Sequence, residues 1–453
     1  MNRLFASLTQ NPARLVSVGF LGLIALGTLL LLMPFSAPDG DSVSPLEAFF
    51  TATSAVTLTG LGVRDTGTGF TAAGQVVILV LIQIGGFGIM SLTSLAGLIL
   101  SGRLGLKTKL YTVAERRTLT VGSVKSTIIG AILLTVICEL LVAGVLTIRM
   151  FMGGYVDSLG SAAWIGFFHS ISAFNNAGFG LNAGSLIPYV GDAWIVLPIG
   201  LAIVFGGLGF PVLDELIARV RLRRQRRKPP RLSMTARITL NGTAVLLIGG
   251  FAMFWALERN HAFAGLSSGD VALAAVFQSI TTRTAGFQSV DFGEMSPNAL
   301  MGTDILMFIG GGSGGTAGGL KITTLFVVLA AIVAEIRGEK DTVIGGRRVD
   351  HTVIRQALTV GAVAVGVITF VIACLRTFNP QFSADQIHFE VISAFATVGL
   401  STGVTADLSG ASQILLCVLM FMGRVGPITL VAALATTTPS KHYSYPAERP
   451  YIG

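Results

Sequence analysis

The chain has 453 residues, of which 52% are hydrophobic and only 12% are charged, and its mean hydropathy is +0.75. This composition predicts a polytopic membrane protein, because most of the surface must face lipid rather than water. The formal net charge of +8 does not indicate nucleic-acid binding, since basic loops beside membrane spans account for the excess. The 56 glycines indicate close helix packing or non-helical backbone inside the bilayer.

A membrane-spanning helix needs about 20 apolar residues, and eight segments reach that length. They are residues 13–34, 72–100, 126–151, 190–217, 235–257, 298–335, 352–376 and 410–436. Within each successive pair lies a shorter apolar run, at 45–58, 161–174, 270–282 and 384–396. As a helix, the run 163–174 would be only about 18 Å long. We therefore expect the short runs to enter the membrane and turn back.

The four short runs end in similar sequences. SAVTLTG ends at Gly60, SAFNNAG at Gly178, ITTRTAG at Gly286 and SAFATVG at Gly399. Their spacing of roughly 110 residues indicates an internal repeat of span, short helix, loop and span. Because each unit crosses the membrane twice, the copies are parallel and can close around a pseudo-fourfold axis.

The expected fold is an all-α polytopic membrane protein, with four tandem parallel repeats around one pore, as in a potassium channel. The predicted repeats are residues 13–101, 125–220, 233–336 and 351–437, followed by a C-terminal tail at 438–453. No cleavable signal peptide is expected, because the first apolar run is long enough to span and no small-residue cleavage motif follows it. Cys138, Cys374 and Cys417 lie in apolar segments, so neither a disulfide nor a metal site is expected.

The lysines and arginines are biased to one side of the predicted spans. The connections 102–125, 219–237 and 337–355, with the two termini, carry 24 of the 31 such residues. The opposite side carries Arg64, Arg149, Arg259, Arg283 and Arg376. The positive-inside rule therefore places both termini in the cytoplasm, with the short helices entering from outside.

The four loops are predicted to line an ion path, because non-helical backbone within a membrane must be packed in protein or face water. Glycine lets the chain turn carbonyls toward an axis, and the short helices point their partially negative ends inward. This arrangement favours a dehydrated monovalent cation. The predicted filter residues are Thr57, Leu58, Thr59, Gly60, Asn175, Asn176, Ala177, Gly178, Arg283, Thr284, Ala285, Gly286, Ala396, Thr397, Val398 and Gly399.

Polar side chains in these loops are expected to face away from the axis and to hold the loops by hydrogen bonds. They are Thr57, Thr59, Asn175, Asn176, Thr284 and Thr397. For the asparagine pair, a local turn or a helix cap is the alternative.

The sixth predicted span contains GGGSGGTAGG, with seven glycines. Each glycine costs about 1 kcal/mol relative to alanine in a helix, so we expect two helices joined by a loop at mid-membrane depth. Close packing through small residues is the alternative, but that needs a single stripe of glycine. The block comprises Gly310, Gly311, Gly312, Ser313, Gly314, Gly315, Thr316, Ala317, Gly318 and Gly319.

Charged side chains within the spans need partners, because insertion costs about 2.5–3.5 kcal/mol for a cation at a helix centre. Arg424 is expected to face the cavity or to tie carbonyls of the broken helix, and Lys321 to act in gating, snorkel or cap the loop. Glu139 is expected to bond between helices, with an ion-related role as the alternative. Glu47 and Glu390 either bond loop backbone or add negative potential at the mouth. Asp65 is expected to anchor its loop, with a role as a cation ligand as the alternative.

The motifs TSAVTLTGLGVRDTG, FHSISAFNNAGF, TRTAGF, ISAFATVGLSTG, FGGLGF and GRVGP carry a family resemblance. Through them the whole chain resembles the ion-translocating subunits of bacterial Ktr potassium-uptake systems, in the Trk/Ktr/HKT superfamily. The first repeat begins near residue 13, which favours the Ktr branch. The resemblance implies a homodimer in the bacterial inner membrane, one pore per protomer, potassium selectivity and uptake that often depends on sodium as an activator.

The resemblance also assigns roles to residues. Its filter glycines correspond to Gly60, Gly178, Gly286 and Gly399, and glycine rather than serine at Gly60 favours potassium. The loop from Gly310 to Gly319 corresponds to a gate below the filter, and Arg424 to an arginine beside it that repels cations when the gate is closed.

This chain has no expected cofactor and no nucleotide-binding motif. The family implies a cytoplasmic partner ring of the KtrA type that binds ATP or ADP, contacted through loops such as 337–350. The basic segment 219–231 either binds anionic membrane lipid or docks an acidic partner. A membrane enzyme is disfavoured, because the glycine motifs supply no cluster of catalytic groups. A carrier with alternating access is the remaining alternative, in which the glycine block moves on a larger scale.

Overall fold

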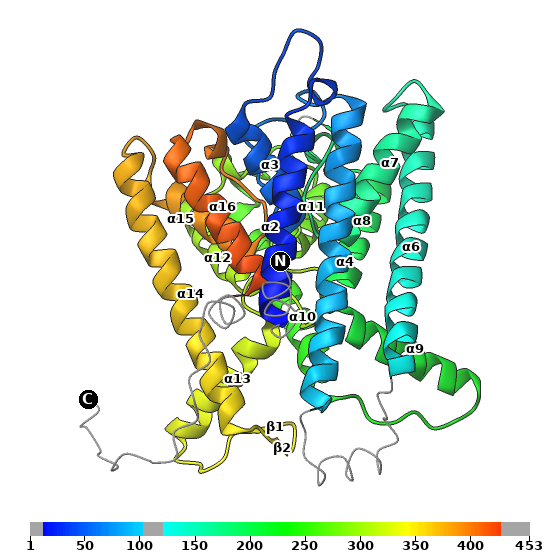
Figure 1. Ribbon diagram of the computed structural model, residues 1–453, viewed down its shortest axis with the longest axis vertical. Coiled ribbons are helices and arrows are strands. Elements are labelled where there is room, and N and C mark those ends of the chain that lie inside the picture. Colours follow the sequence, from blue (N-terminus) through cyan, green and yellow to red (C-terminus); the bar gives the residue numbers. More distant parts are fainter. Residues whose placement is uncertain (1–11, 103–120, 183, 427–453) are drawn as a thin grey trace, which may run out of the picture.

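The computed structural model describes residues 12–102, 121–182 and 184–426. The predicted tail at 438–453 and the end of the eighth predicted span lie outside the described residues. Within them the fold is almost entirely helical, with a single two-stranded antiparallel hairpin formed by β1 (Val343–Ile344) and β2 (Arg347–Arg348). Figure 1 shows long helices standing side by side, with short helices between them in the upper half of the view.

The helices form four successive groups, each with a long helix, a short helix and a returning segment. The long helices are α2 (Pro12–Leu31), α6 (Val121–Met152), α10 (Met234–Glu258) and α14 (His351–Phe378). The short helices are α3 (Pro45–Thr57), α7 (Leu159–Phe174), α11 (Ser268–Thr281) and α15 (Ala384–Ala396). The returning segments are α4 (Ala72–Gly102), α8 (Ala193–Leu208) with α9 (Phe210–Arg224), α12 (Pro297–Phe308) with α13 (Ile322–Ile336), and α16 (Gly410–Val425). Single turns of 3-10 helix lie in the connections, at Pro34–Ser36, Ile187–Tyr189, Phe292–Glu294 and Thr405–Asp407.

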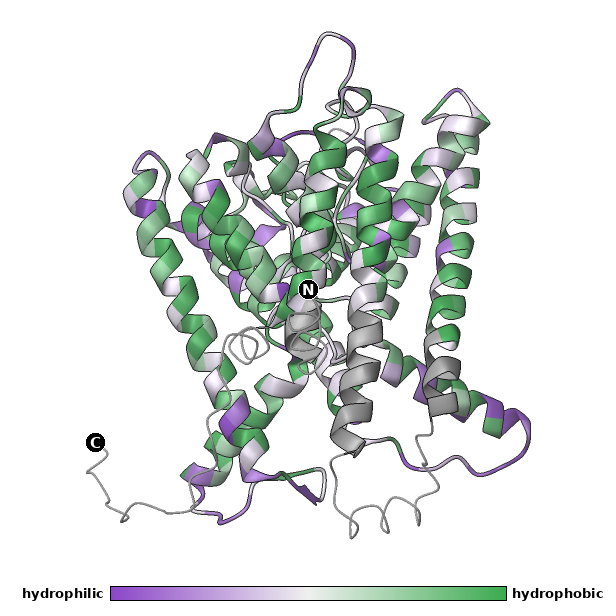
Figure 2. Cartoon of the chain, in the orientation of Figure 1, coloured by the Kyte–Doolittle hydropathy of each residue, from purple (hydrophilic) through white to green (hydrophobic). Residues whose placement is uncertain are grey.

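Three described helices are long and apolar enough to cross a membrane, namely Ile129–Met152, Met234–Glu258 and His351–Phe378. The pair α8 and α9 also qualifies when it is counted as one span. The long helices are mostly hydrophobic along their length (Figure 2), and Leu141 and Ile248 are 66% and 69% exposed. A helix whose apolar side chains face outward is stable in lipid, where its own backbone bonds are all satisfied.

Each short helix begins at a serine that caps it. The hydroxyls of Ser44, Ser158, Ser267 and Ser383 each accept the backbone N–H three residues later. In α3 and α15 the side chain at that position, Glu47 or Gln386, accepts the serine N–H in return. Such capping boxes satisfy amides that a helix start leaves unpaired, so the sequence fixes where these helices begin.

The short helices form the centre of the core. Each contributes a phenylalanine that is almost completely buried, namely Phe50, Phe168, Phe277 and Phe389. These rings pack against the long helices around them in four apolar clusters. The packing fixes the depth at which each short helix ends.

Two predicted spans are interrupted. The sixth breaks between Phe308 and Ile322, where the sequence predicts a loop. The prediction of one continuous fourth span over 190–217 is wrong, because α8 and α9 are separated at Gly209 and differ in direction by 100°. Gly209 has φ +89°, a conformation that side chains disfavour. Pro211 follows in the first turn of α9, where proline is well tolerated.

Candidate functional site

The four loops that follow the short helices meet at their glycines. A β-carbon added to Gly60 would lie 3.0 Å from the Cα of Gly178, and one added to Gly178 would lie 3.0 Å from that of Gly286. A β-carbon on Gly286 would lie 3.2 Å from the Cα of Gly399, and one on Gly399 would lie 2.9 Å from that of Gly60. The contacts therefore close a ring in the order of the sequence, and each glycine faces the backbone of the next loop.

The backbone of the four loops follows one pattern. The ring glycines have φ values of +89°, +71°, +78° and +90°. The residue two positions earlier is also left-handed in each loop, at Leu58, Asn176, Thr284 and Thr397. Left-handed residues other than glycine are uncommon and persist where the surroundings hold them. Added side chains at the glycines would collide with the carbonyl oxygens of Ala177, Ala285, Val398 and Thr59 in turn.

Serine and threonine side chains bind the loop backbone. The N–H of Gly60 donates to Ser54 Oγ at 3.0 Å, and that of Gly399 donates to Ser393 Oγ at 3.1 Å. Thr57 Oγ1 lies 2.7 Å from the carbonyl oxygen of Thr53 and 2.8 Å from Thr59 Oγ1. Thr284 and Thr397 are buried, and their hydroxyls have no hydrogen-bond partner among the described residues.

The second loop is tied to two long helices through Asn175. Its Nδ2 lies 2.9 Å from Gln83 Oε1 on α4 and 3.1 Å from Glu139 Oε1 on α6. Gln83 Nε2 also donates to Glu139, at 3.1 Å. Asn175 is at the same time the C-terminal cap of α7, so the cap and the loop anchor are one residue. Glu139 forms hydrogen bonds between helices, as the sequence predicts. No sequence pattern pointed to Gln83 as its partner.

The glycine block between α12 and α13 packs into the break between α8 and α9. The N–H of Gly312 donates to the carbonyl oxygen of Gly207 at 2.9 Å, and that of Thr316 to Gly206 at 3.2 Å. The N–H of Phe210, the first residue of α9, donates to the carbonyl oxygen of Gly314 at 3.3 Å. Backbone contacts as close as these leave no room for side chains. A β-carbon on Gly315 would lie only 2.9 Å from the carbonyl oxygen of Gly206.

Two cations contact the block, of which Arg424 is buried and Lys321 is partly buried. Arg424 of α16 donates from Nη1 to the carbonyl oxygen of Thr316, and Lys321 donates to that of Ala317. Nε and Nη2 of Arg424 have no protein partner among the described residues. Arg424 therefore does bind a carbonyl of the broken helix. Arg283 is buried and lines a small pocket with Ile203, Gly207 and others.

A polar pocket of about 310 Å³ lies on the other side of the ring from the glycine block and includes Gly60, Gly178, Arg64, Asp65 and Gln288 in its lining. We call this pocket the vestibule. Asp65 accepts the N–H and hydroxyl of Thr68, both at 2.8 Å, so it anchors its loop as the sequence predicts.

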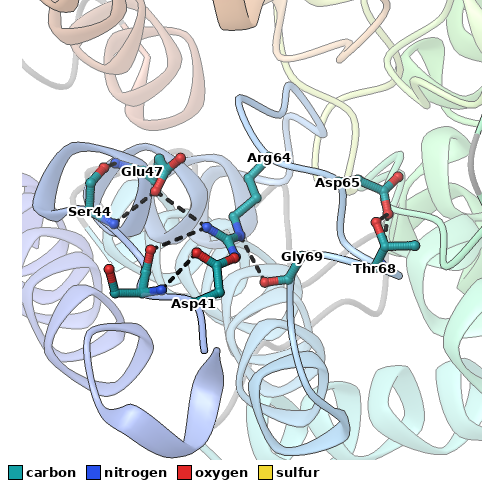
Figure 3. A network of polar contacts seen from close by, with 8 residues as sticks. Asp41, Ser44, Glu47, Arg64, Asp65, Thr68 and Gly69 are labelled. Atoms are coloured by element: carbon teal, nitrogen blue, oxygen red, sulfur yellow. Dashed lines mark hydrogen bonds and ion pairs between the residues drawn. The ribbon is translucent and has the colours of Figure 1, made fainter. Parts of the chain in front are cut away.

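Arg64 at the vestibule is held by carboxylates (Figure 3). It pairs with Asp41, lies 3.6 Å from Glu47, and donates to the carbonyl oxygen of Gly69 at 2.8 Å. The backbone N–H of Ser42 and the Arg64 guanidinium lower the pKa of Asp41 below its ordinary value. The positive charge nearest the vestibule is thus neutralised by its neighbours.

Buried carboxylates brace the loops that follow the ring. Glu390 accepts the hydroxyls of Ser401 and Thr405 at 2.6 and 2.7 Å and the N–H of Thr402 at 3.0 Å. Glu258, which the sequence did not single out, accepts the N–H groups of Ser296 and Ala262. Among the described residues, no three or more histidine, cysteine, aspartate or glutamate side chains lie close enough to hold a metal ion together. Cys138, Cys374 and Cys417 are free thiols.

Long apolar helices, a ring of backbone loops and a glycine block beneath it define a polytopic membrane protein of the ion-transport class. The chain belongs to the TrkH family of cation transport proteins, whose family model matches residues 9–445. It is accordingly an ion transporter and not an enzyme.

Curated relatives match the chain over nearly all of their length. The chain is 38% identical to the Ktr system potassium uptake protein B of Bacillus subtilis, over 98% of this chain and 97% of that protein. It is 35% identical to the protein of the same name from Vibrio alginolyticus, over 94% and 92%. The potassium/sodium uptake protein NtpJ of Enterococcus hirae is 33% identical, over 98% and 97%.

The fold also matches a solved structure. The potassium transporter TrkH from Vibrio parahaemolyticus superimposes with a TM-score of 0.69 at 19% identity, covering 92% of this chain and 85% of that chain. At this identity the match concerns the fold alone.

Proposed function

We propose that this chain is the ion-translocating subunit of a potassium-uptake system and that the four loops form its selectivity filter. The observation that carries the proposal is the closed ring of Gly60, Gly178, Gly286 and Gly399. Carbonyl oxygens held around an axis replace the hydration shell of a dehydrated cation. The names of the relatives, two potassium uptake proteins and one potassium/sodium uptake protein, support potassium as the substrate.

The four helix groups correspond in this proposal to the four parallel repeats, at 13–101, 125–220, 233–336 and 351–437. The filter residues are those of the four loops, from Thr57 to Gly60, Asn175 to Gly178, Arg283 to Gly286 and Ala396 to Gly399. Their backbone oxygens face the ion, while side chains such as Asn175 and Thr57 hold the loops from behind. The common left-handed positions in all four loops support this assignment.

The glycine block is proposed as the gate. It lies under the second loop, where Thr316 contacts both Asn176 and the carbonyl oxygen of Phe174. Hydrogen bonds to the α8–α9 break and to Arg424 and Lys321 hold it there. A gate held by a few such bonds can be released by small movements of α9 or α16, because a net hydrogen bond contributes only about 1 kcal/mol.

The charge bias and the family resemblance support the following proposed setting. Both termini and the basic loops face the cytoplasm of a bacterial inner membrane. The chain acts as a homodimer with one pore per protomer, sodium activates uptake, and a KtrA-type ring that binds ATP or ADP controls the gate. The hairpin between α13 and α14 exposes Arg347 and Arg348, which gives that ring a basic contact surface.

The decisive experiment compares Gly60→Ser with wild type in cells that lack their own potassium systems. A β-carbon at Gly60 would lie 2.4 Å from the carbonyl oxygen of Ala177, so the substitution must distort the ring. We expect wild type to restore growth at low potassium and the variant to let sodium compete for uptake of labelled rubidium.

Gly62→Ser is the matched control, since a β-carbon there meets only the carbonyl oxygen of Arg64, at 3.3 Å. Equal selectivity of Gly60→Ser and wild type, at matched expression, would show that the ring is a scaffold and would overturn the proposal.

A further inference from the structure

A lateral groove of about 540 Å³ lies outside the ion path, where α9 turns away from α8 and passes α6. Its lining includes Leu134 and Cys138 of α6 and Phe205 of α8. Figure 1 shows α9 running sideways near the lower end of the bundle. The groove is therefore open toward the lipid that surrounds the helices, at the level where the basic loops begin.

The face of α9 in this groove changes from apolar to basic along the helix. Leu213, Leu216, Ile217 and Val220 line the groove first, and Arg221 and Arg224 line its far end. Most of these residues recur at intervals of three and four, which places them along one side of a helix. Figure 2 shows the same change, from hydrophobic near α8 to hydrophilic at the outer end.

The apolar part of the groove is unusually exposed for a protein in water. Ile217 and Val220 are 43% and 53% exposed, and Phe205 is 42% exposed. Within the described part of the chain, the guanidinium groups of Arg221 and Arg224 make neither a hydrogen bond nor an ion pair. An apolar slot that ends at two unpaired arginines is complementary to an acyl chain attached to a phosphate.

We propose that this groove is a binding site for one anionic phospholipid. An acyl chain lies between α6 and α8, against Leu134, Cys138 and Phe205. The phosphate accepts hydrogen bonds from Arg221 and Arg224, whose fork-shaped donors suit phosphate oxygens. The site differs from a general attraction of lipid to basic loops, because it has a slot for the chain and a fixed position for the headgroup.

The experiment uses the purified full-length protein in detergent, with phosphatidylglycerol or phosphatidylcholine of identical acyl chains added. Cys138 lies in the groove, so its alkylation by N-ethylmaleimide, measured on its own peptide by mass spectrometry, reports occupancy. We expect phosphatidylglycerol to slow alkylation of Cys138 several-fold and phosphatidylcholine to have little effect. Cys374 on α14 is the internal reference, and native mass spectrometry counts the lipids retained.

Arg221→Gln with Arg224→Gln should abolish the protection. Arg223→Gln with Arg227→Gln removes the same charge from residues outside the groove lining and should retain it. Equal protection of Cys138 by both lipids would show that the groove binds acyl chains without recognising the headgroup. Equal loss of protection in both double variants would show that diffuse surface charge, and not a defined site, attracts the lipid. Either result would overturn the site, and neither depends on whether the protein transports potassium.

Discussion

Thr316 of the glycine block donates its hydroxyl toward Asn176 Oδ1, 3.2 Å away, and toward the carbonyl oxygen of Phe174, 3.3 Å away. Asn176 is one of the left-handed residues of the second loop, two positions before Gly178. The glycine block therefore contacts the second loop directly. A movement of the block must break these contacts.

Removing this contact should release the block. Thr316→Val keeps the shape of the side chain but removes the hydroxyl, so we expect a higher maximal rate of potassium uptake in the absence of any partner ring. Thr323→Val is the control, since Thr323 contacts the block through Ser313, 2.8 Å away, and not through the ring. Uptake into liposomes by the purified protein measures both. An unchanged rate for Thr316→Val would mean that the contact does not hold the gate.

Substitutions of Arg424 separate its charge from its hydrogen bond. Arg424→Ala removes both and should raise maximal uptake several-fold. Arg424→Lys keeps the charge but loses the planar donor group that reaches Thr316. If the hydrogen bond holds the block, Arg424→Lys also raises uptake; if electrostatic repulsion closes the path, Arg424→Lys behaves as wild type. Thermal unfolding of both variants checks that the fold survives, and Arg376→Ala, on the exposed end of α14, controls for loss of charge.

Glu139 is expected to position the second loop. Glu139→Leu leaves the Nε2 donor of Gln83 without its acceptor, which costs about 1–3 kcal/mol in a buried site. Asn175 loses one of the three acceptors of its Nδ2 and keeps Gln83 Oε1 and the carbonyl oxygen of Ile171. We expect a lower unfolding temperature and a several-fold higher KM for potassium, with Glu139→Gln intermediate because one oxygen remains. Gln83→Leu should resemble Glu139→Leu, and the double variant should be less than additive. Additive effects would show that the two residues act separately.

Freeing Arg64 at the vestibule should slow cation entry. With Asp41→Asn and Glu47→Gln together, its charge is no longer neutralised, so uptake at low ionic strength should fall and recover in high salt. Adding Arg64→Gln should restore the rate. A triple variant as slow as the double would show that the carboxylates themselves, and not the unmasked arginine, matter.

The same ion pair predicts how uptake responds to external pH. Because the pKa of Asp41 is lowered by Ser42 and Arg64, the pairing is fully present above the ordinary aspartate value of about 3.9. The pairing is lost only as the pH falls through the lowered pKa of Asp41 in the folded protein. Uptake should therefore lose no contribution from this pair between neutral and mildly acidic pH. If Asp41→Asn removed an acid sensitivity near pH 6, this expectation would be wrong.

Lipid binding in the groove should also affect the gate. The reason is that the N–H of Phe210, the first residue of α9, donates to the carbonyl oxygen of Gly314 in the glycine block. If the proposed function holds, liposomes with phosphatidylglycerol should support a different uptake rate from liposomes of phosphatidylcholine alone. Arg221→Gln with Arg224→Gln should remove that difference, while Arg223→Gln with Arg227→Gln should keep it. Lipid binding without any effect on uptake would separate the site from gating.

The sequence by itself determined the elements of this protein, because the signals for them are local. The lengths of apolar runs distinguish helices that can span from those that must turn back. Ser44 and Ser383, each followed three residues later by Glu47 or Gln386, mark where short helices begin. Seven glycines in the block forbid a stable helix there, and helix α12 indeed ends at Phe308 and α13 begins at Ile322.

Only the tertiary structure decided which elements meet. The hydropathy of 190–217 is continuous, so the bend at Gly209 was missed, although Gly209 and Pro211 are the residues that permit it. Gln83, Glu139 and Asn175 come from three segments far apart in the chain, and no periodicity relates them. Likewise, the glycine block lies in the α8–α9 break because backbones can approach closely only where both sides lack side chains. Such contacts depend on how helices pack in three dimensions, which local patterns do not encode.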